Sequence, residues 1–111
     1  DVYLINTGWT GGPYGEGKRI DLPYTRTMVD AALNGKLKDA EYEEDEHFHL
    51  KRPICCPGVP DKILNPKETW EDPESFERRA EKLAEEFSDH FDRAYGDKNI
   101  DREIVRECPG K

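Results

Sequence analysis

Residues 9–26 read WTGGPYGEGKRIDLPYTR, and this stretch decides how the start of the chain is built. Glycine fills four of its first nine positions, a density that does not suit the interior of a helix or strand. Gly12–Arg19 also comes within one residue of the phosphate-binding pattern G-x-x-x-x-G-K-[ST]. A flexible surface loop is the alternative, but Trp9 and Tyr14 are large rings that usually become covered. The stretch predicts a loop whose backbone comes close to a ligand.

The phosphate-loop interpretation fails on both chemistry and context. Arg19 stands where the pattern needs a hydroxyl for magnesium, and a guanidinium has five donors but no acceptor. A phosphate loop leads directly into a helix, whereas Gly17–Pro23 predicts a short extended segment, because a residue before proline avoids helical angles. We expect the next helix to begin near Thr25 as its N-cap and to end at Asn34-Gly35.

The composition limits the partners and the setting of the chain. Its 111 residues carry 25 acidic and 17 basic side chains, a formal charge of −8, which disfavours nucleic acid. No run of 18 apolar residues is present, so we expect no membrane span. The three cysteines, an odd number without framework spacing, favour a reducing, cytosolic setting. With 34% hydrophobic residues, the chain is poorly supplied for a core of its own.

The first residues predict a buried strand. Val2–Ile5 is a continuous apolar run, typical of a strand covered on both faces, and such a strand needs neighbours that the remaining sequence hardly offers. We therefore expect residues 1–111 to be a single partial domain cut from a larger α/β protein, α+β as an isolated piece. An ordinary N-terminal edge strand is the alternative.

The remaining elements follow from local patterns. The acidic residues 41–46 predict a solvated loop, residues 47–50 a short half-buried strand, residues 53–60 an irregular segment and residues 65–70 a helical turn. A long amphipathic helix is expected from the Asp72 cap to Gly96, followed by a weakly structured tail over residues 97–111 with a short helix near Ile104. Its apolar stripe consists of Phe76, Ala80, Leu83, Ala84, Phe87 and Phe91.

No catalytic or metal-binding residues are expected in this chain. His47, His49, Cys55 and Cys56 are potential ligands within ten residues, but they lack the paired spacing of a structural zinc site. Neighbouring side chains on an extended segment point in opposite directions, which argues against a shared ion. No nucleophilic side chain and general base can be recognised as a catalytic pair from their spacing in the sequence.

Taken in order, these motifs resemble the C-terminal region of ATP-dependent phosphoenolpyruvate carboxykinase. The likeness covers nearly the whole chain, includes the downstream stretch CPGVPDKILNPKETW, and is least distinctive over the last fifteen residues. The motifs that carry it nearer the start are Asn6-Thr7-Gly8-Trp9, Gly17-Lys18-Arg19-Ile20, Tyr24-Thr25-Arg26 and Ala32-Leu33-Asn34-Gly35.

The resemblance implies part of the mononucleotide-binding lobe of a cytoplasmic lyase that converts oxaloacetate and ATP to phosphoenolpyruvate, carbon dioxide and ADP, a step of gluconeogenesis. By motif position, Arg19, Ile20 and Thr25 would line the adenine and ribose end of ATP. Mg²⁺ and Mn²⁺ would act in the complete enzyme, but their ligands, the phosphate loop and the oxaloacetate-binding region are not among these residues. We therefore expect the 111 residues alone to be inactive.

The expected partners are ATP or ADP and the missing N-terminal part of the enzyme, with self-association of the isolated chain. A stand-alone nucleotide-binding or protein-interaction module derived from the same lobe is the competing interpretation. Coding sequence that extends upstream into a phosphate loop favours the fragment. A monodisperse chain with protected sheet edges favours the module.

Overall fold

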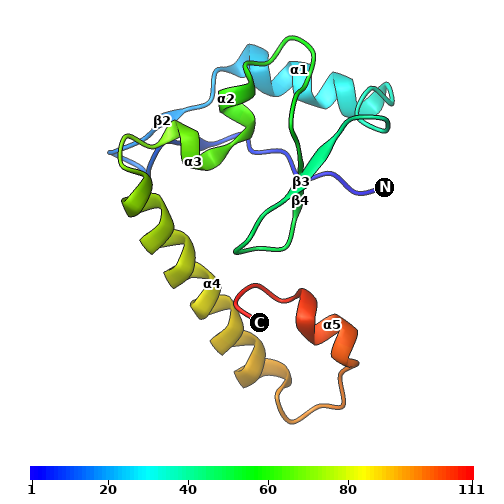
Figure 1. Cartoon of the computed structure of the whole chain (residues 1–111), viewed down its shortest axis with the longest axis vertical. Helices are drawn as coiled ribbons and strands as arrows, with labels where there is room; N and C mark the ends of the chain where they lie inside the picture. Colours follow the sequence, from blue (N-terminus) through cyan, green and yellow to red (C-terminus); the bar gives the residue numbers. More distant parts are fainter.

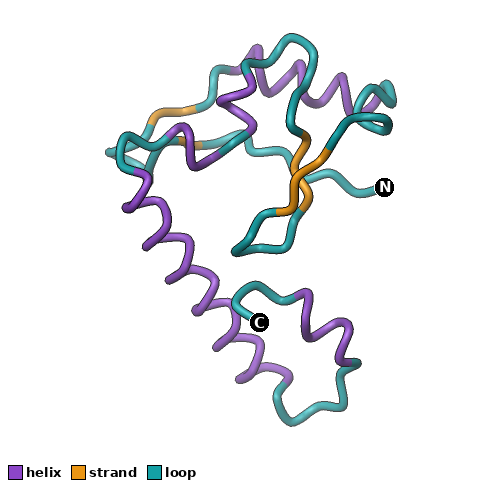
Figure 2. The backbone as a smooth tube through the Cα atoms, in the orientation of Figure 1, coloured by secondary structure: helices purple, strands orange, loops and turns teal.

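Short elements joined by turns make up the chain in the computed structural model, which describes all of residues 1–111. Together they form a small mixed helix and strand unit (Figures 1 and 2). In chain order the elements are β1 (Trp9–Thr10), β2 (Lys18–Arg19), α1 (Leu22–Leu33), β3 (Tyr42–Glu44), β4 (Lys51–Pro53), α2 (Asp61–Leu64), α3 (Pro66–Thr69), α4 (Pro73–Tyr95) and α5 (Arg102–Glu107).

The strands form two separate antiparallel pairs, β1 with β2 and β3 with β4. The predicted buried strand over Val2–Ile5 is wrong for this chain: these residues form no strand, and Val2 and Leu4 are 92% and 79% exposed. An apolar run becomes a buried strand only where neighbouring strands take up its backbone N–H and C=O groups. No strand of this chain does so.

The N-cap of helix α1 lies four residues earlier than predicted, because proline fits the first turn of the helix. Leu22 is the first helical residue and Pro23 the second, so Asp21 rather than Thr25 is the N-cap, without a side-chain capping bond. The predicted end is confirmed. Leu33 is the last helical residue, and Gly35 has a φ of 72°, the left-handed conformation that glycine adopts freely.

The acidic segment was predicted as a loop and is instead partly a strand. Tyr42–Glu44 pairs with Lys51–Pro53, which places Glu43 opposite Arg52 and Glu44 opposite Lys51. The side chains of Glu43 and Arg52 form an ion pair. Opposite charges across an antiparallel pair stabilise the pairing, and this effect is invisible in the local sequence of either strand. The strand expected over residues 47–50 is the connection between β3 and β4.

Helix α4 spans 23 residues, close to the predicted limits. The Asp72 side chain accepts a hydrogen bond from the Glu74 backbone N–H, and Pro73 occupies the first turn. Ala80 and Ala84 are buried, whereas Leu83 and Phe87 remain about half exposed. In Figure 1 the helix leads away from the strands, and α5 returns beside its C-terminal half. The short helix expected near Ile104, within the tail over residues 97–111, is confirmed as α5.

The apolar core is small. Its centre consists of Ala31, Leu37, Cys56 and Val59, and only 8 of the 111 residues are buried. The accessible surface is 8505 Å², against about 6,300 Å² for a folded monomer of this mass. The radius of gyration is 15.7 Å, against about 13 Å for a compact domain of this length. The chain therefore leaves apolar surface open that a closed domain would cover.

None of the helices combines the length and the apolar run that a membrane crossing requires.

Two leucines near the end of α1 test the position of the core. Leu37 is buried and Leu33 is 80% exposed. We expect Leu37→Ala to lower the free energy of unfolding by about 2–4 kcal/mol, because it leaves a cavity in the core. Leu33→Ala makes the same chemical change at the surface and should cost less than about 0.5 kcal/mol. Urea unfolding of the two variants measures the difference, and equal losses would contradict this core.

Candidate functional site

A two-stranded ribbon carries the candidate nucleotide residues. Strands β1 and β2 pair with Trp9 opposite Arg19 and Thr10 opposite Lys18, and the Ile20 N–H donates to the Gly8 carbonyl at 2.9 Å. Residues 11–17 form the connecting loop, in which the Gly17 N–H donates to the Pro13 carbonyl at 2.9 Å. The ribbon thus holds the backbone of Arg19 and Ile20 through hydrogen bonds.

Two glycines of this loop sit where a side chain has no room. Gly17 packs against the backbone oxygens of Gly12 and Thr10, and an added Cβ would overlap both. Gly11 has a φ of 79°, and a Cβ there would lie 2.8 Å from the carbonyl oxygen of Thr69 in α3. The close approach expected from the glycine density is therefore an approach of the chain to itself at these two positions.

The three predicted nucleotide residues lie in different surroundings. Arg19 is exposed on β2. Ile20 follows it, is 8% exposed and lines a large cavity, while Thr25 is 7% exposed in α1 and does not line that cavity. Of the three, only Ile20 lines the cavity; Arg19 is its exposed neighbour on the ribbon, and Thr25 lies apart in the first turns of α1.

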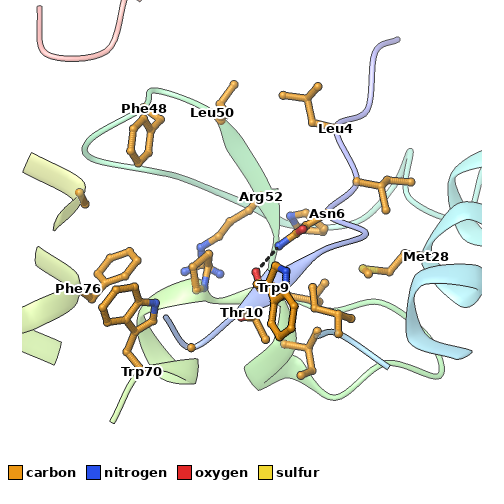
Figure 3. A pocket seen from close by; sticks show the side chains of 18 of the residues that line it. Leu4, Asn6, Trp9, Thr10, Met28, Phe48, Leu50, Arg52, Trp70 and Phe76 are labelled. Atoms are coloured by element: carbon orange, nitrogen blue, oxygen red, sulfur yellow. Dashed lines mark hydrogen bonds between the residues drawn. The ribbon is translucent and has the colours of Figure 1, made fainter. Parts of the chain in front are cut away.

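The cavity has a volume of about 980 Å³ and is lined by 30 residues, 18 of them hydrophobic. It lies between the N-terminal segment, the ribbon, the β3–β4 pair and the first turns of α4. Figure 3 shows Trp9 facing into it from the ribbon, with Trp70 and Phe76 together on another wall. The rings of Trp70 and Phe76 meet edge to face, their centroids 5.8 Å apart.

Charge in the cavity differs in sign from that of the whole chain. Its charged lining residues are four basic ones and one acidic one, namely Lys51, Arg52, Arg79, Lys82 and Glu86. The complete chain, by contrast, has a formal charge of −8. An apolar surface with basic side chains suits a partner or ligand that combines apolar groups with negative charge.

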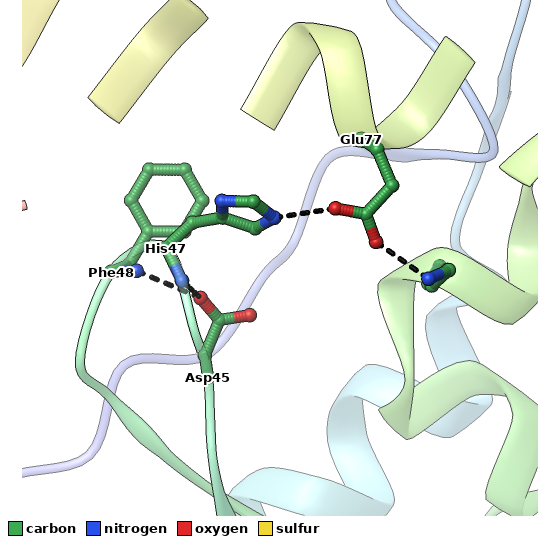
Figure 4. Close-up of polar contacts among 5 residues, drawn as sticks. Asp45, His47, Phe48 and Glu77 are labelled. Carbon is green, nitrogen blue, oxygen red and sulfur yellow. Dashed lines mark hydrogen bonds and ion pairs between the residues drawn. The ribbon is translucent and has the colours of Figure 1, made fainter. Parts of the chain in front are cut away.

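A second polar cluster fastens the β3–β4 connection to α4 (Figure 4). His47 Nε2 lies 2.8 Å from one carboxylate oxygen of Glu77, and Lys67 Nζ lies 2.5 Å from the other. Asp45 orders the turn, because its carboxylate accepts hydrogen bonds from the backbone N–H groups of His47 and Phe48. One glutamate of α4 therefore holds both the turn and α3.

These contacts shift the acid–base behaviour of the pair. The hydrogen bond from Lys67, followed by the one from His47, lowers the pKa of the Glu77 carboxyl. The same hydrogen bond with Glu77 raises the pKa of Lys67. Both shifts favour the charged forms, so the ion pair persists at neutral pH.

The four potential metal ligands from the sequence serve other roles or stay apart. His47 pairs with Glu77, and His49 occupies the turn with a φ of 58°. Cys55 is exposed, while Cys56 belongs to the core and burial raises the pKa of its thiol. No group of three His, Cys, Asp or Glu side chains is placed to hold a metal ion. The residues present thus do not fit the Mg²⁺ and Mn²⁺ that the resemblance implies.

Comparison with known proteins decides the family. The family model described as phosphoenolpyruvate carboxykinase, in its ATP-dependent form, matches residues 1–62, more than half of the chain. The chain belongs to the ATP-dependent phosphoenolpyruvate carboxykinase family. The ribbon, the glycine-rich loop and α1 all lie within the matched residues.

Curated members of the carboxykinase family resemble nearly the whole chain. Phosphoenolpyruvate carboxykinase (ATP) of Caldanaerobacter subterraneus subsp. tengcongensis is 49% identical over 108 residues, which cover 97% of this chain and 20% of that protein. The protein of the same name from Bacillus subtilis is 54% identical over 91 residues, 82% of this chain and 17% of that protein. The first of the two proteins of Moorella thermoacetica is 56% identical over 90 residues, 81% of this chain and 17% of that protein. The chain thus spans about a fifth of the length of these carboxykinases.

The Glu77 cluster predicts a defined response to acid. A carboxyl whose pKa is lowered by folding contributes stability above its unfolded pKa, about 4.3, and loses that contribution as the pH falls through the folded value. Glu77→Gln should therefore flatten the decline of the urea midpoint between pH 6 and pH 3. Glu85→Gln, on the exposed face of the same helix, should keep the wild-type slope. A slope in Glu77→Gln as steep as in the wild type would contradict the lowered pKa.

Proposed function

We propose that this chain is the part of an ATP-dependent phosphoenolpyruvate carboxykinase that supplies the adenine and ribose side of the ATP site. The reaction is the conversion of oxaloacetate and ATP to phosphoenolpyruvate, carbon dioxide and ADP. The observation that carries the proposal is the ribbon that places Ile20 in the wall of an apolar cavity and leaves the neighbouring Arg19 exposed, within the residues matched by the family.

Each proposed residue has a chemistry suited to one part of the nucleotide. The planar guanidinium of Arg19 is exposed on β2, where it can stack and donate to ribose or phosphate oxygens. The Ile20 side chain offers an apolar wall to a flat base. The Thr25 hydroxyl can exchange a hydrogen bond with a nitrogen on the base edge once the remaining site has formed around α1.

The chemical step itself does not belong to these residues. Phosphoryl transfer depends on metal ions that neutralise charge on the transferring group, and this chain places no set of ligands for one. No nucleophile, general base or metal ligand of the reaction is proposed here. The residues of this chain bind and orient the nucleotide.

The missing part of the carboxykinase is the proposed cover for the open side of the chain. The accessible surface of 8505 Å² and the exposed Val2 and Leu4 support this assignment, since apolar patches of this kind mark interfaces. In the complete enzyme, Val2–Ile5 would pair as a strand in the α/β nucleotide-binding lobe, and the stripe of α4 would be covered. Without that cover, the isolated chain is expected to self-associate.

A stand-alone module would need to close its own apolar surface, and the openness of this chain speaks against that alternative. The three cysteines are all free, which fits the reducing cytoplasm proposed for the enzyme.

The isolated chain should lack carboxykinase activity, because it contains no metal ligands and no residues for oxaloacetate. The assay is the formation of phosphoenolpyruvate from oxaloacetate and ATP, with the complete enzyme under the same conditions as the positive control. Turnover by the purified 111 residues would refute the proposal that this chain binds the nucleotide and the rest of the enzyme supplies the catalytic residues.

Nucleotide affinity of the complete enzyme tests the site residues. Arg19→Ala should weaken ATP binding about tenfold, the effect of losing a hydrogen bond to a charged group. Thr25→Ala removes a neutral hydrogen bond and should weaken it about threefold. Arg102→Ala removes an exposed arginine of α5, remote from the ribbon, and serves as the control. Unchanged ATP affinity in both site variants, measured by titration calorimetry, would remove the assignment.

A further inference from the structure

We infer that Thr69, at the end of α3, is a positioning residue that sets the place of the nucleotide-binding ribbon; the inference rests on the function proposed above. Its hydroxyl oxygen lies 2.8 Å from that of Thr10 in β1, a partly buried contact between residues 59 positions apart. It is a direct side-chain hydrogen bond between the ribbon and α3.

The direction of this hydrogen bond follows from a second one. The Thr69 hydroxyl donates its single proton to the Pro66 carbonyl at 2.7 Å. Thr10 must therefore be the donor in the bond between the two threonines, and Thr69 the acceptor. Valine at either position keeps the side-chain shape but removes this bond.

Close packing reinforces the contact at the next residue. Gly11 lies against the Thr69 carbonyl so closely that a Cβ at Gly11 would be 2.8 Å from that oxygen. The start of the glycine-rich loop thus rests on the end of α3 through both backbone and side chain. The ring of Tyr14, farther along the loop, is 82% exposed and gives little support from the other side.

A shift of Thr10 moves the proposed site residues Arg19 and Ile20, because all three lie on the same two-stranded ribbon. Thr10 pairs with Lys18, and Trp9 beside it pairs with Arg19. Gly17 packs on the carbonyl of Thr10, so β2 follows any shift of β1. A loosened contact at Thr69 therefore displaces Arg19 and the neighbouring Ile20 relative to the cavity.

Helix α3 is held in place by contacts with α4, so it can fix the position of the ribbon. The ion pair between Lys67 and Glu77 joins it to α4, and the ring of Trp70, which follows α3, packs against Phe76 of α4. The ribbon is thus located by α4 through α3, although the two are distant in sequence. Displacing a binding group by about 1 Å is enough to weaken its contacts measurably.

The experiment measures ATP binding to the complete enzyme for Thr69→Val, Thr10→Val and the double variant. We expect each single variant to weaken ATP about fivefold, the range of one neutral hydrogen bond, and the double variant to weaken it no further. Thr69→Ser keeps the hydroxyl and should restore the wild-type affinity. Inorganic tripolyphosphate lacks base and ribose, so it should lose less affinity than ATP in the Thr10 and Thr69 variants, because it cannot contact Ile20 and can reach Arg19 only through phosphate oxygens.

Thr27→Val is the matched control. The Thr27 hydroxyl also donates to a proline carbonyl, that of Pro23 at 2.8 Å, but it forms no hydrogen bond with the ribbon. This variant should bind ATP as the wild type does. It separates the loss of a threonine–proline hydrogen bond within a helix from the loss of the contact to Thr10.

The outcomes separate the inference from the proposed function. If Arg19→Ala weakens ATP but Thr69→Val does not, the positioning role is wrong and the nucleotide site stands. If Thr69→Val weakens ATP and tripolyphosphate equally and lowers the thermal midpoint, its role is only structural and the inference fails. If Arg19→Ala leaves ATP affinity unchanged, the proposed site fails and the positioning of that site fails with it.

Discussion

A shortage of internal apolar packing governs this structure. Only eight residues are buried, so the separate pieces are held in place by a few polar contacts between them. Glu77 joins the β3–β4 turn and α3 to α4, and Thr69 joins α3 to the ribbon. Such contacts contribute little each in water, but they fix direction and distance. The position of the ribbon that carries the proposed nucleotide residues therefore depends on these polar contacts more than on an apolar core.

Local signals predicted the helices well. The Asp72 cap, Pro73 and the apolar stripe define α4 within a single stretch, and Gly35 marks the end of α1. Strands were predicted poorly, because a strand exists only through its partner. Val2–Ile5 has the composition of a buried strand but no neighbour here, and Tyr42–Glu44 looks like a loop until Lys51–Pro53 lies beside it.

The candidate site, too, could be predicted from the sequence only in part. Ordered motifs pointed to Arg19 and Ile20, which are neighbours on one ribbon, but the sequence did not show that only Ile20 lines the cavity. The same series of motifs pointed to Thr25, which lies in α1. The structure shows in addition that Thr25 is buried. The bond from Thr10 to Thr69 and the pair of His47 with Glu77 join residues 59 and 30 positions apart. No spacing rule in one sequence connects such positions.

The basic lining of the cavity has a kinetic consequence. Four of its five charged residues are positive, although the chain as a whole is strongly negative. A field divided in this way orients an approaching acidic surface before contact and speeds productive encounters. Dissolved ions cancel the effect beyond about 10 Å at 0.1 M salt. The attraction of this lining for a negatively charged group therefore weakens as the ionic strength rises, whereas the apolar contacts of the same walls do not depend on charge.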